Sequence, residues 1–344
     1  MTSLNDILIA APKLEAQLIL AFMYTILWYI LINHVFVPIG NSFIAKLKSK
    51  KRFIHFNRES FKNTIKWDIG DDEEEQIIAI SRIDAAMVQH LIGGLLLIPS
   101  AFRLGHFLPA GADRALASHG GLSEMGWEIQ DLVFRTAEII FGGERGLKLN
   151  PPSLMLTLLA HHSAACSAVI PMNMFYPNGM NGVWHEGFCI VQLGSFILLF
   201  MQQYGYTLDV QTKDGLKKMK IAISISFFTC LWTRVVRYFW ILKLLHDGFS
   251  VDGSLRLIQV GFLPSMLLSV FNLVVMRDAA QKFMKFVSMD IKKLKTHSQR
   301  NIQETIKKLG SIKDLPSKST LNHSYLRSSK LYTGVSAEDI FGDY

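Results

Sequence analysis

Long apolar blocks separated by charged stretches constrain this chain more than any other feature. An α-helix that crosses a lipid bilayer needs about 20 consecutive, mostly apolar residues. Hydrophobic residues make up 50% of the 344-residue sequence, and its mean hydropathy is +0.25. The sequence therefore predicts an all-α, polytopic transmembrane helical bundle. About seven spans are expected, at residues 14–37, 83–107, 124–141, 153–175, 183–204, 219–245 and 255–276.

The third block, at residues 124–141, is the weakest of the seven because it is rich in polar and charged side chains. Such side chains are costly at membrane depth, so neighbouring helices must enclose most of this block if it spans. Its polar residues are Glu124, Glu128, Gln130, Asp131, Arg135 and Glu138.

The distribution of lysine and arginine predicts the topology. Cations collect after the first block, after the fifth block and in the C-terminal tail, whereas the loop at 178–182 has none. Loops rich in cations stay on the cytosolic side of a membrane. We therefore expect the N-terminus to be lumenal and the C-terminus to be cytosolic. The first block is too long for a cleavable signal peptide and is expected to be retained as a helix.

Four regions follow from this pattern: a first transmembrane helix at 1–40, a cytosolic segment at 41–81, a transmembrane domain at 82–285 and a basic, partly disordered tail at 286–344. The segment at 41–81 combines a basic amphipathic stretch with an acidic linker. Phe53, Phe56, Phe61 and Ile65 share one helical face in that stretch. We expect this helix to lie on the cytosolic leaflet and to bind anionic lipids. The net charge of +8 is assigned to topology and lipid rather than to nucleic acid.

Four titratable residues are expected at a similar depth in three of the spans. A rise of about 1.5 Å per residue puts His90, the His161/His162 pair and Asp131 roughly 12–16 Å from the cytosolic end. Titratable residues at that depth are functional candidates. The sequence thus predicts one polar layer, reached from the cytosolic side.

Each of these residues also has a structural interpretation. His90 is a single buried histidine, and Asp131 has Arg135 as an ion-pair partner four residues away on the same helix. Arg234 and Glu186, with Arg237, are compatible with a structural ion network across the bundle. Trp127 is compatible with a packing role.

Six short segments occur in an order that resembles the TLC-domain family of membrane proteins, which includes TRAM and the longevity-assurance proteins (ceramide synthases). The resemblance covers about residues 82–285. A histidine follows an arginine in RIDAAMVQH, an aspartate follows an aromatic residue in MGWEIQDL, and AHHSAA holds the histidine pair. The other three segments contain Glu186, Arg234 and Asn272. The segments are residues 82–90, 125–132, 160–165, 185–188, 227–239 and 269–283.

The resemblance implies a barrel-like bundle of six helices around an intramembrane cavity. It also implies residence in the endoplasmic reticulum and sphingolipid chemistry, in which an acyl group moves from acyl-CoA to a long-chain amine. On this interpretation the catalytic residues are His161, His162 and Asp131. The residues implied to bind substrate are His90, Trp127, Glu186, Arg234 and Asn272. Acyl-CoA is then a co-substrate, with no bound cofactor. The expected partners are membrane lipids, and formation of a homo-oligomer stays open.

One departure from the ceramide-synthase pattern keeps a second function open. That pattern ends in His-Asp-x-x-Asp, whereas this chain has His185 and Glu186 with Cys189 in the last place. A non-catalytic protein of the same family, which binds, senses or transports lipid, is therefore the alternative. A di-metal hydroxylase or desaturase needs histidine clusters on several helices. This chain has one His-His pair, so the sequence predicts no metal site.

Overall fold

The computed structural model describes the backbone of residues 3–65, 67–251 and 255–289, and this part of the chain contains helices and no strand. The side chains at 63–65, 164–165 and 255–263 lie outside the described part. Almost all of the predicted tail at 286–344 also lies outside it.

Capping residues begin two of the long helices several residues before their apolar blocks. The Asp72 carboxylate accepts hydrogen bonds from the N–H groups of Glu74 and Glu75. Thr212 accepts one from the N–H group of Gly215. Such side chains satisfy N–H groups that lack a partner in the first helical turn. The helices are α1 (Leu4–Leu8), α2 (Leu14–Leu31), α3 (Val37–Lys46), α4 (Lys50–Ile65), α5 (Glu73–Ala101), α6 (Ala112–Leu149), α7 (Pro152–Phe175), α8 (Val183–Thr207), α9 (Lys213–Cys230), α10 (Arg237–Val251) and α11 (Leu255–Val287).

Two of the predicted spans continue through a wider, π-helical turn. The turn at Ile32–Phe36 joins α2 to α3, and the turn at Leu231–Val236 joins α9 to α10. A π-helical turn inside an α-helix is uncommon and often lies at a functional site. The second turn carries Arg234, one of the residues predicted to bind substrate.

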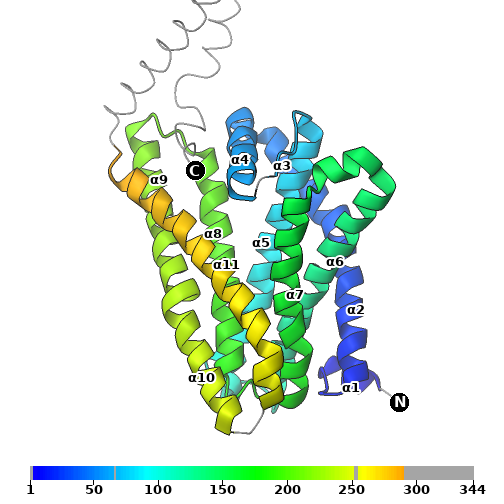
Figure 1. The fold of residues 1–344 in the computed structure, drawn as a ribbon. Coiled ribbons are helices and arrows are strands. Elements are labelled where there is room, and N and C mark those ends of the chain that lie inside the picture. Colours follow the sequence, from blue (N-terminus) through cyan, green and yellow to red (C-terminus); the bar gives the residue numbers. More distant parts are fainter. Residues whose placement is uncertain (1–2, 66, 252–254, 290–344) are drawn as a thin grey trace, which may run out of the picture.

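Five helical segments of the described chain are long and apolar enough to cross a membrane. They are Leu14–Lys46, Glu73–Ala101, Pro152–Phe175, Val183–Thr207 and Lys213–Val251. This is a multi-span helical membrane protein, with fewer spans of that quality than the predicted seven. Helices α6 and α11 run beside the other five (Figure 1) but do not belong to that set. Membrane crossing by these two helices stays a prediction.

The weakest predicted span, in α6, buries its charges among other helices. Glu124, Glu128, Asp131 and Arg135 are all at most 8% exposed. This enclosure agrees with the expectation that lipid touches only part of the helix. The cost of burying charge is reduced where charged groups pair with one another.

Six of the long helical segments contact one another in a closed ring. The order of contacts is α5, α8, α9–α10, α11, α7, α6 and back to α5. Helix α2 lies outside the ring and packs against α6 (Figure 1). Side chains that point into the ring from different helices therefore face one another.

Glycines allow two of these helix pairs to approach closely. A Cβ atom on Gly126 of α6 would lie 2.5 Å from the Cβ atom of Tyr24 in α2. A Cβ atom on Gly94 of α5 would lie 2.6 Å from a methyl carbon of Leu193 in α8. Small residues at helix contacts favour this kind of packing in membranes.

The basic amphipathic segment forms α4, and its aromatic face packs on the protein. Phe53, Phe56 and Phe61 are at most 5% exposed and belong to a core that includes Leu154 of α7 and Phe286 of α11. The expectation that these rings face a lipid leaflet is therefore wrong, because the end of the bundle covers them. The side chain of Ile65, predicted on the same face, lies outside the described part. Binding of anionic lipid by the cations of α4 stays a prediction.

Candidate functional site

Helix α6 presents three buried carboxylates on one face. Glu124, Glu128 and Asp131 follow one another at spacings of four and three residues, which puts them on one side of an α-helix. Each is at most 8% exposed. This face of α6 supplies most of the negative charge of the candidate site.

His162 of α7 lies between two of these carboxylates. Its Nε2 atom is 3.3 Å from Oδ2 of Asp131, and its Nδ1 atom is 3.6 Å from Oε1 of Glu128. The other oxygen of Asp131 accepts a hydrogen bond from Nε of Arg135 at 2.9 Å. Arg135 also donates to Oδ1 of Asn150 at 3.0 Å. Asp131 therefore makes both predicted contacts, one to Arg135 and one to the histidine pair.

His90 of α5 faces the third carboxylate. Its Nδ1 atom is 3.4 Å from Oε2 of Glu124. The Trp127 ring lies between the two histidines, with its centroid 6.2 Å from that of His90 and 5.5 Å from that of His162. The structure thus brings His90, Asp131 and the histidine pair together, as the estimated depths predict, and Trp127 lies beside them.

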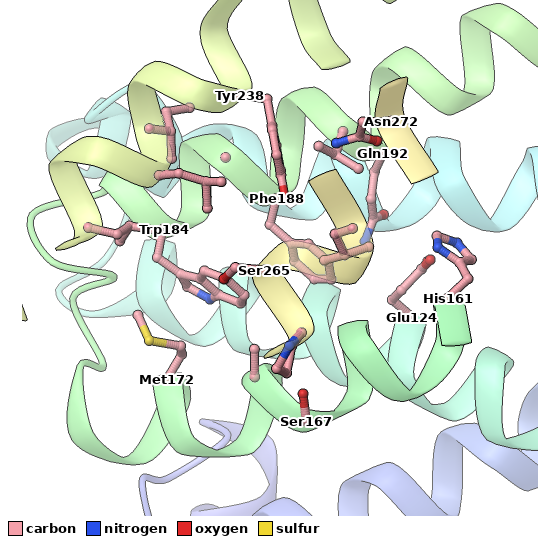
Figure 2. A pocket seen from close by; sticks show the side chains of 18 of the residues that line it. Glu124, His161, Ser167, Met172, Trp184, Phe188, Gln192, Tyr238, Ser265 and Asn272 are labelled. Atoms are coloured by element: carbon pink, nitrogen blue, oxygen red, sulfur yellow. The ribbon is translucent and has the colours of Figure 1, made fainter. Parts of the chain in front are cut away.

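The polar groups lie at one end of an apolar cavity of about 330 Å³ inside the ring. Figure 2 shows Glu124, His161, Gln192 and Asn272 at this end, and Met172 and Trp184 at the other. A volume in the range of roughly 300–1,000 Å³ and an apolar lining with a few polar groups are typical of small-molecule sites.

The cavity extends in the direction opposite to the predicted one. The α7 residues that line it start at His161 and continue to Met172, and the α8 residues start at Trp184. The cavity therefore runs from the histidines toward the α7–α8 connection, away from the basic loops. Toward the basic loops lies the contact between Arg135 and Asn150. Access to the polar layer from that side stays a prediction.

The two histidines of the pair have different surroundings. His161 lines the cavity, and its ring stacks on Phe271 of α11 with centroids 4.4 Å apart. His162 is 1% exposed and is not among the residues that line the cavity. A ligand in the cavity therefore meets His161, while His162 lies behind it among carboxylates.

Arg234 lies on the cavity wall and is held by neutral oxygens. Its guanidinium donates to Oδ1 of Asn272 at 2.9 Å, to the carbonyl oxygen of Val191 at 3.4 Å and to the Ser195 hydroxyl. Both Arg234 and Asn272 line the cavity and are at most 4% exposed. The π-helical turn carries this positive charge into the site.

Glu186, predicted to bind substrate, lies apart from the histidines, whereas Trp127 lies beside His90 and His162 without lining the cavity. The two carboxylate oxygens of Glu186 accept hydrogen bonds from Nε and Nη2 of Arg237 at 2.6 and 2.8 Å. Glu186 does not line the cavity. Its place in the resembling segments implied substrate binding, but the order of segments does not tell which way a side chain points around its helix. Among the described ion pairs, the predicted network therefore includes Arg237 with Glu186 but not Arg234.

Several residues of the site were not predicted. Glu124 and Glu128 are predicted only as charged residues of the weakest span. Their spacing with Asp131 could have shown that all three carboxylates lie on one face of the helix. Gln192 and Phe271 carry no comparable signal, because their positions depend on which helices become neighbours. Among the described residues, Glu128, His161 and His162 each offer a metal-ligand atom, and these atoms lie within 4.8 Å of one another.

Comparison of the chain with protein-family models, with curated proteins and with solved structures finds no match.

Proposed function

We propose that this membrane protein is a TLC-type lipid enzyme that transfers an acyl group from acyl-CoA to a long-chain amine, with His161 as the reacting imidazole. The observation that carries the proposal is an apolar cavity inside the helix ring that ends on that imidazole. The apolar part of the cavity would bind an acyl chain, and its polar end would bind the carbonyl and amine groups that react.

The ring of α5, α6, α7, α8, α9–α10 and α11 supports the TLC-type assignment, because the family implies six helices around a cavity. Five of the residues implied by the family are near one another in this ring: His90, Asp131, the histidine pair and Arg234. Arg237 holds Glu186 away from them.

In this reaction the amine nitrogen forms a bond to the acyl carbon, the carbon–sulfur bond of the thioester breaks, and the amine proton passes to the CoA thiolate. An amine reacts only when it is unprotonated, so a base that takes its proton accelerates the step. His161 serves as that base or as a transient acyl acceptor. His162 does not reach the cavity, so its role is to hold its neighbours through Asp131 and Glu128.

A second function, lipid binding without chemistry, is favoured by the direction of the cavity. Acyl-CoA is expected in the cytosol, whereas the cavity runs away from the basic loops that mark the expected cytosolic side. The same cavity would then bind a membrane lipid, with its headgroup at the polar cluster.

One assay separates these functions. Purified protein in lipid–detergent micelles is given isotope-labelled acyl-CoA and a sphingoid base, and the amide is measured by mass spectrometry. We expect amide from the native chain and a rate about 10²–10⁴-fold lower for His161→Ala, the range for loss of a general base. His106→Ala is the matched control, because His106 lies in a short 3₁₀ turn outside the cavity.

Equal rates for native protein and His161→Ala would remove His161 from the mechanism. Co-purified lipid without amide formation would favour the binding function, and the absence of both would contradict the two functions together. Residence in the endoplasmic reticulum belongs to the same proposal and is tested by imaging the tagged chain.

A further inference from the structure

Several side-chain nitrogen and oxygen atoms near the polar end of the cavity have no hydrogen-bond partner among the described residues. They include Oε1 of Glu128 and the Nδ1 atoms of His161 and His162. Glu128 and His162 are each 1% exposed, so their unpaired atoms have little access to water. Buried polar atoms are seldom unpaired in proteins, and each such group calls for an explanation such as a bound ion.

The positions of these groups fit a metal ion. Ligand atoms around a tetrahedral zinc ion lie roughly 3.3 Å apart, since each is about 2.0–2.1 Å from the metal. Nδ1 of His162 and Oε1 of Glu128 are 3.6 Å apart. The ligand atoms of Glu128, His161 and His162 all lie within 4.8 Å of one another. Binding of an ion would draw these three atoms closer together, to the tetrahedral spacing.

The other ring nitrogen of His162 has the partner that a metal-binding histidine needs. A ligating imidazole usually donates its second N–H group to a carboxylate or a carbonyl oxygen, which fixes the ring. Nε2 of His162 is 3.3 Å from Oδ2 of Asp131, and Arg135 holds that carboxylate in turn. This contact leaves Nδ1 of His162 directed at Glu128.

The charge of the cluster also favours a cation. Among the described ion pairs, Glu124 has only His90 as a partner and Glu128 has only His162, whereas Asp131 has Arg135. The charges of Glu124 and Glu128 are therefore balanced only if the neighbouring imidazoles are protonated. A divalent ion compensates these charges while both imidazoles stay neutral ligands.

The geometry points to a site for one divalent transition-metal ion of the zinc class, bound by Glu128, His161 and His162. Two imidazoles and one carboxylate form a ligand set that zinc uses in catalytic sites, with the fourth position open. His161 and Glu128 both line the cavity, so the open position faces a bound lipid. Cys166, which donates to Oε2 of Glu128 at 3.2 Å, orients that carboxylate.

The metal site goes beyond the proposed acyl transfer and does not depend on it. An ion on His161 occupies the ring that acyl transfer needs free, so the transfer assay is run with and without a chelator. Metal binding is measured without acyl-CoA or amine. A failure of one proposal therefore leaves the other intact.

The test uses the full chain purified in detergent, loaded with excess Zn²⁺ and freed of loosely bound metal by gel filtration. Elemental analysis is expected to find about one zinc per chain, as in a three-ligand protein site. We expect the zinc to be lost in His161→Ala and in Glu128→Gln, and retained in the matched control His106→Ala. Asp131→Asn should weaken the affinity by about 10–100-fold, as for other residues that orient a ligand.

A measurement on the native chain tests the site even if some variants do not fold. Co²⁺ bound in place of Zn²⁺ should give the intense visible absorption of a tetrahedral site, and X-ray absorption should show imidazole nitrogens around the metal. An octahedral Co²⁺ spectrum, or no zinc retained by the native chain, would overturn the site. Equal zinc in native protein and a folded His161→Ala variant would overturn it as well.

Discussion

At the scale of single residues, the carboxylates on α6 differ in what faces them. Asp131 contacts both Arg135 and His162, Glu128 contacts His162 and Cys166, and Glu124 contacts only His90 among the described ion pairs. Asp131 is therefore the structural member of the three, whereas Glu124 and Glu128 both line the cavity.

Arg135 is expected to matter more for stability than an exposed arginine such as Arg145. Arg135→Ala leaves Asp131 without its cation, and removal of one partner from a buried ion pair costs about 3–5 kcal/mol. We expect a clear fall in the midpoint of thermal denaturation, measured in detergent by size-exclusion chromatography. The matched control is Arg145→Ala, because the Arg145 side chain is 72% exposed and pairs with Glu75. An exposed pair contributes about 0–1 kcal/mol. Equal losses in both variants would contradict this difference.

At the scale of helices, the apolar blocks predict where each helix lies in the chain but not which helices become neighbours. The block at 183–204 became α8 almost unchanged, because Gly182 precedes it in a left-handed conformation with φ of 87°. The contact of α5 with α8 depends on packing between Gly94 and Leu193, which are far apart in the sequence. A local sequence pattern does not predict such a contact. The cavity residues Gln192 and Phe271 were missed for this reason.

The contact between α2 and α6 gives a prediction at this scale. Gly126→Ala puts a Cβ atom 2.5 Å from Tyr24 and 2.8 Å from the backbone nitrogen of Thr25, so α2 must shift. Overpacking of this kind costs about 1–3 kcal/mol. We expect lower thermal stability in detergent.

The control is Gly142→Ala, because a Cβ atom there has no neighbour within 4 Å. We expect Gly142→Ala to change the stability by less than about 1 kcal/mol, the usual difference between glycine and alanine in a helix. A loss for Gly142→Ala as large as that for Gly126→Ala would show that close packing on α2 is not the cause.

At the scale of the whole molecule, cations and the cavity lie toward opposite ends. Helix α4 and the start of α9 carry lysines at the end of the bundle where α11 also ends. The cavity extends toward the other end, where α7 connects to α8. The topology rule predicts that the first end is cytosolic. The cavity would then extend toward the lumenal leaflet.

Labelling of single cysteines tests this orientation. The three native cysteines lie inside helices and are at least partly buried. In sealed microsomes, a membrane-impermeant maleimide should react with Asp214→Cys without detergent. It should react with Asn178→Cys, in the α7–α8 connection, only after detergent opens the membrane. The reverse pattern would put the basic loops in the lumen and contradict the predicted topology.

The central claim is that a lipid acyl chain occupies the cavity with its polar group at His161. A cryo-EM map of the full chain in lipid nanodiscs tests it most directly. We expect continuous density in the cavity from Trp184 to His161, ending within hydrogen-bond distance of that imidazole. A map with side chains closing this space, and lipid only on the outer faces of the helices, would contradict the account.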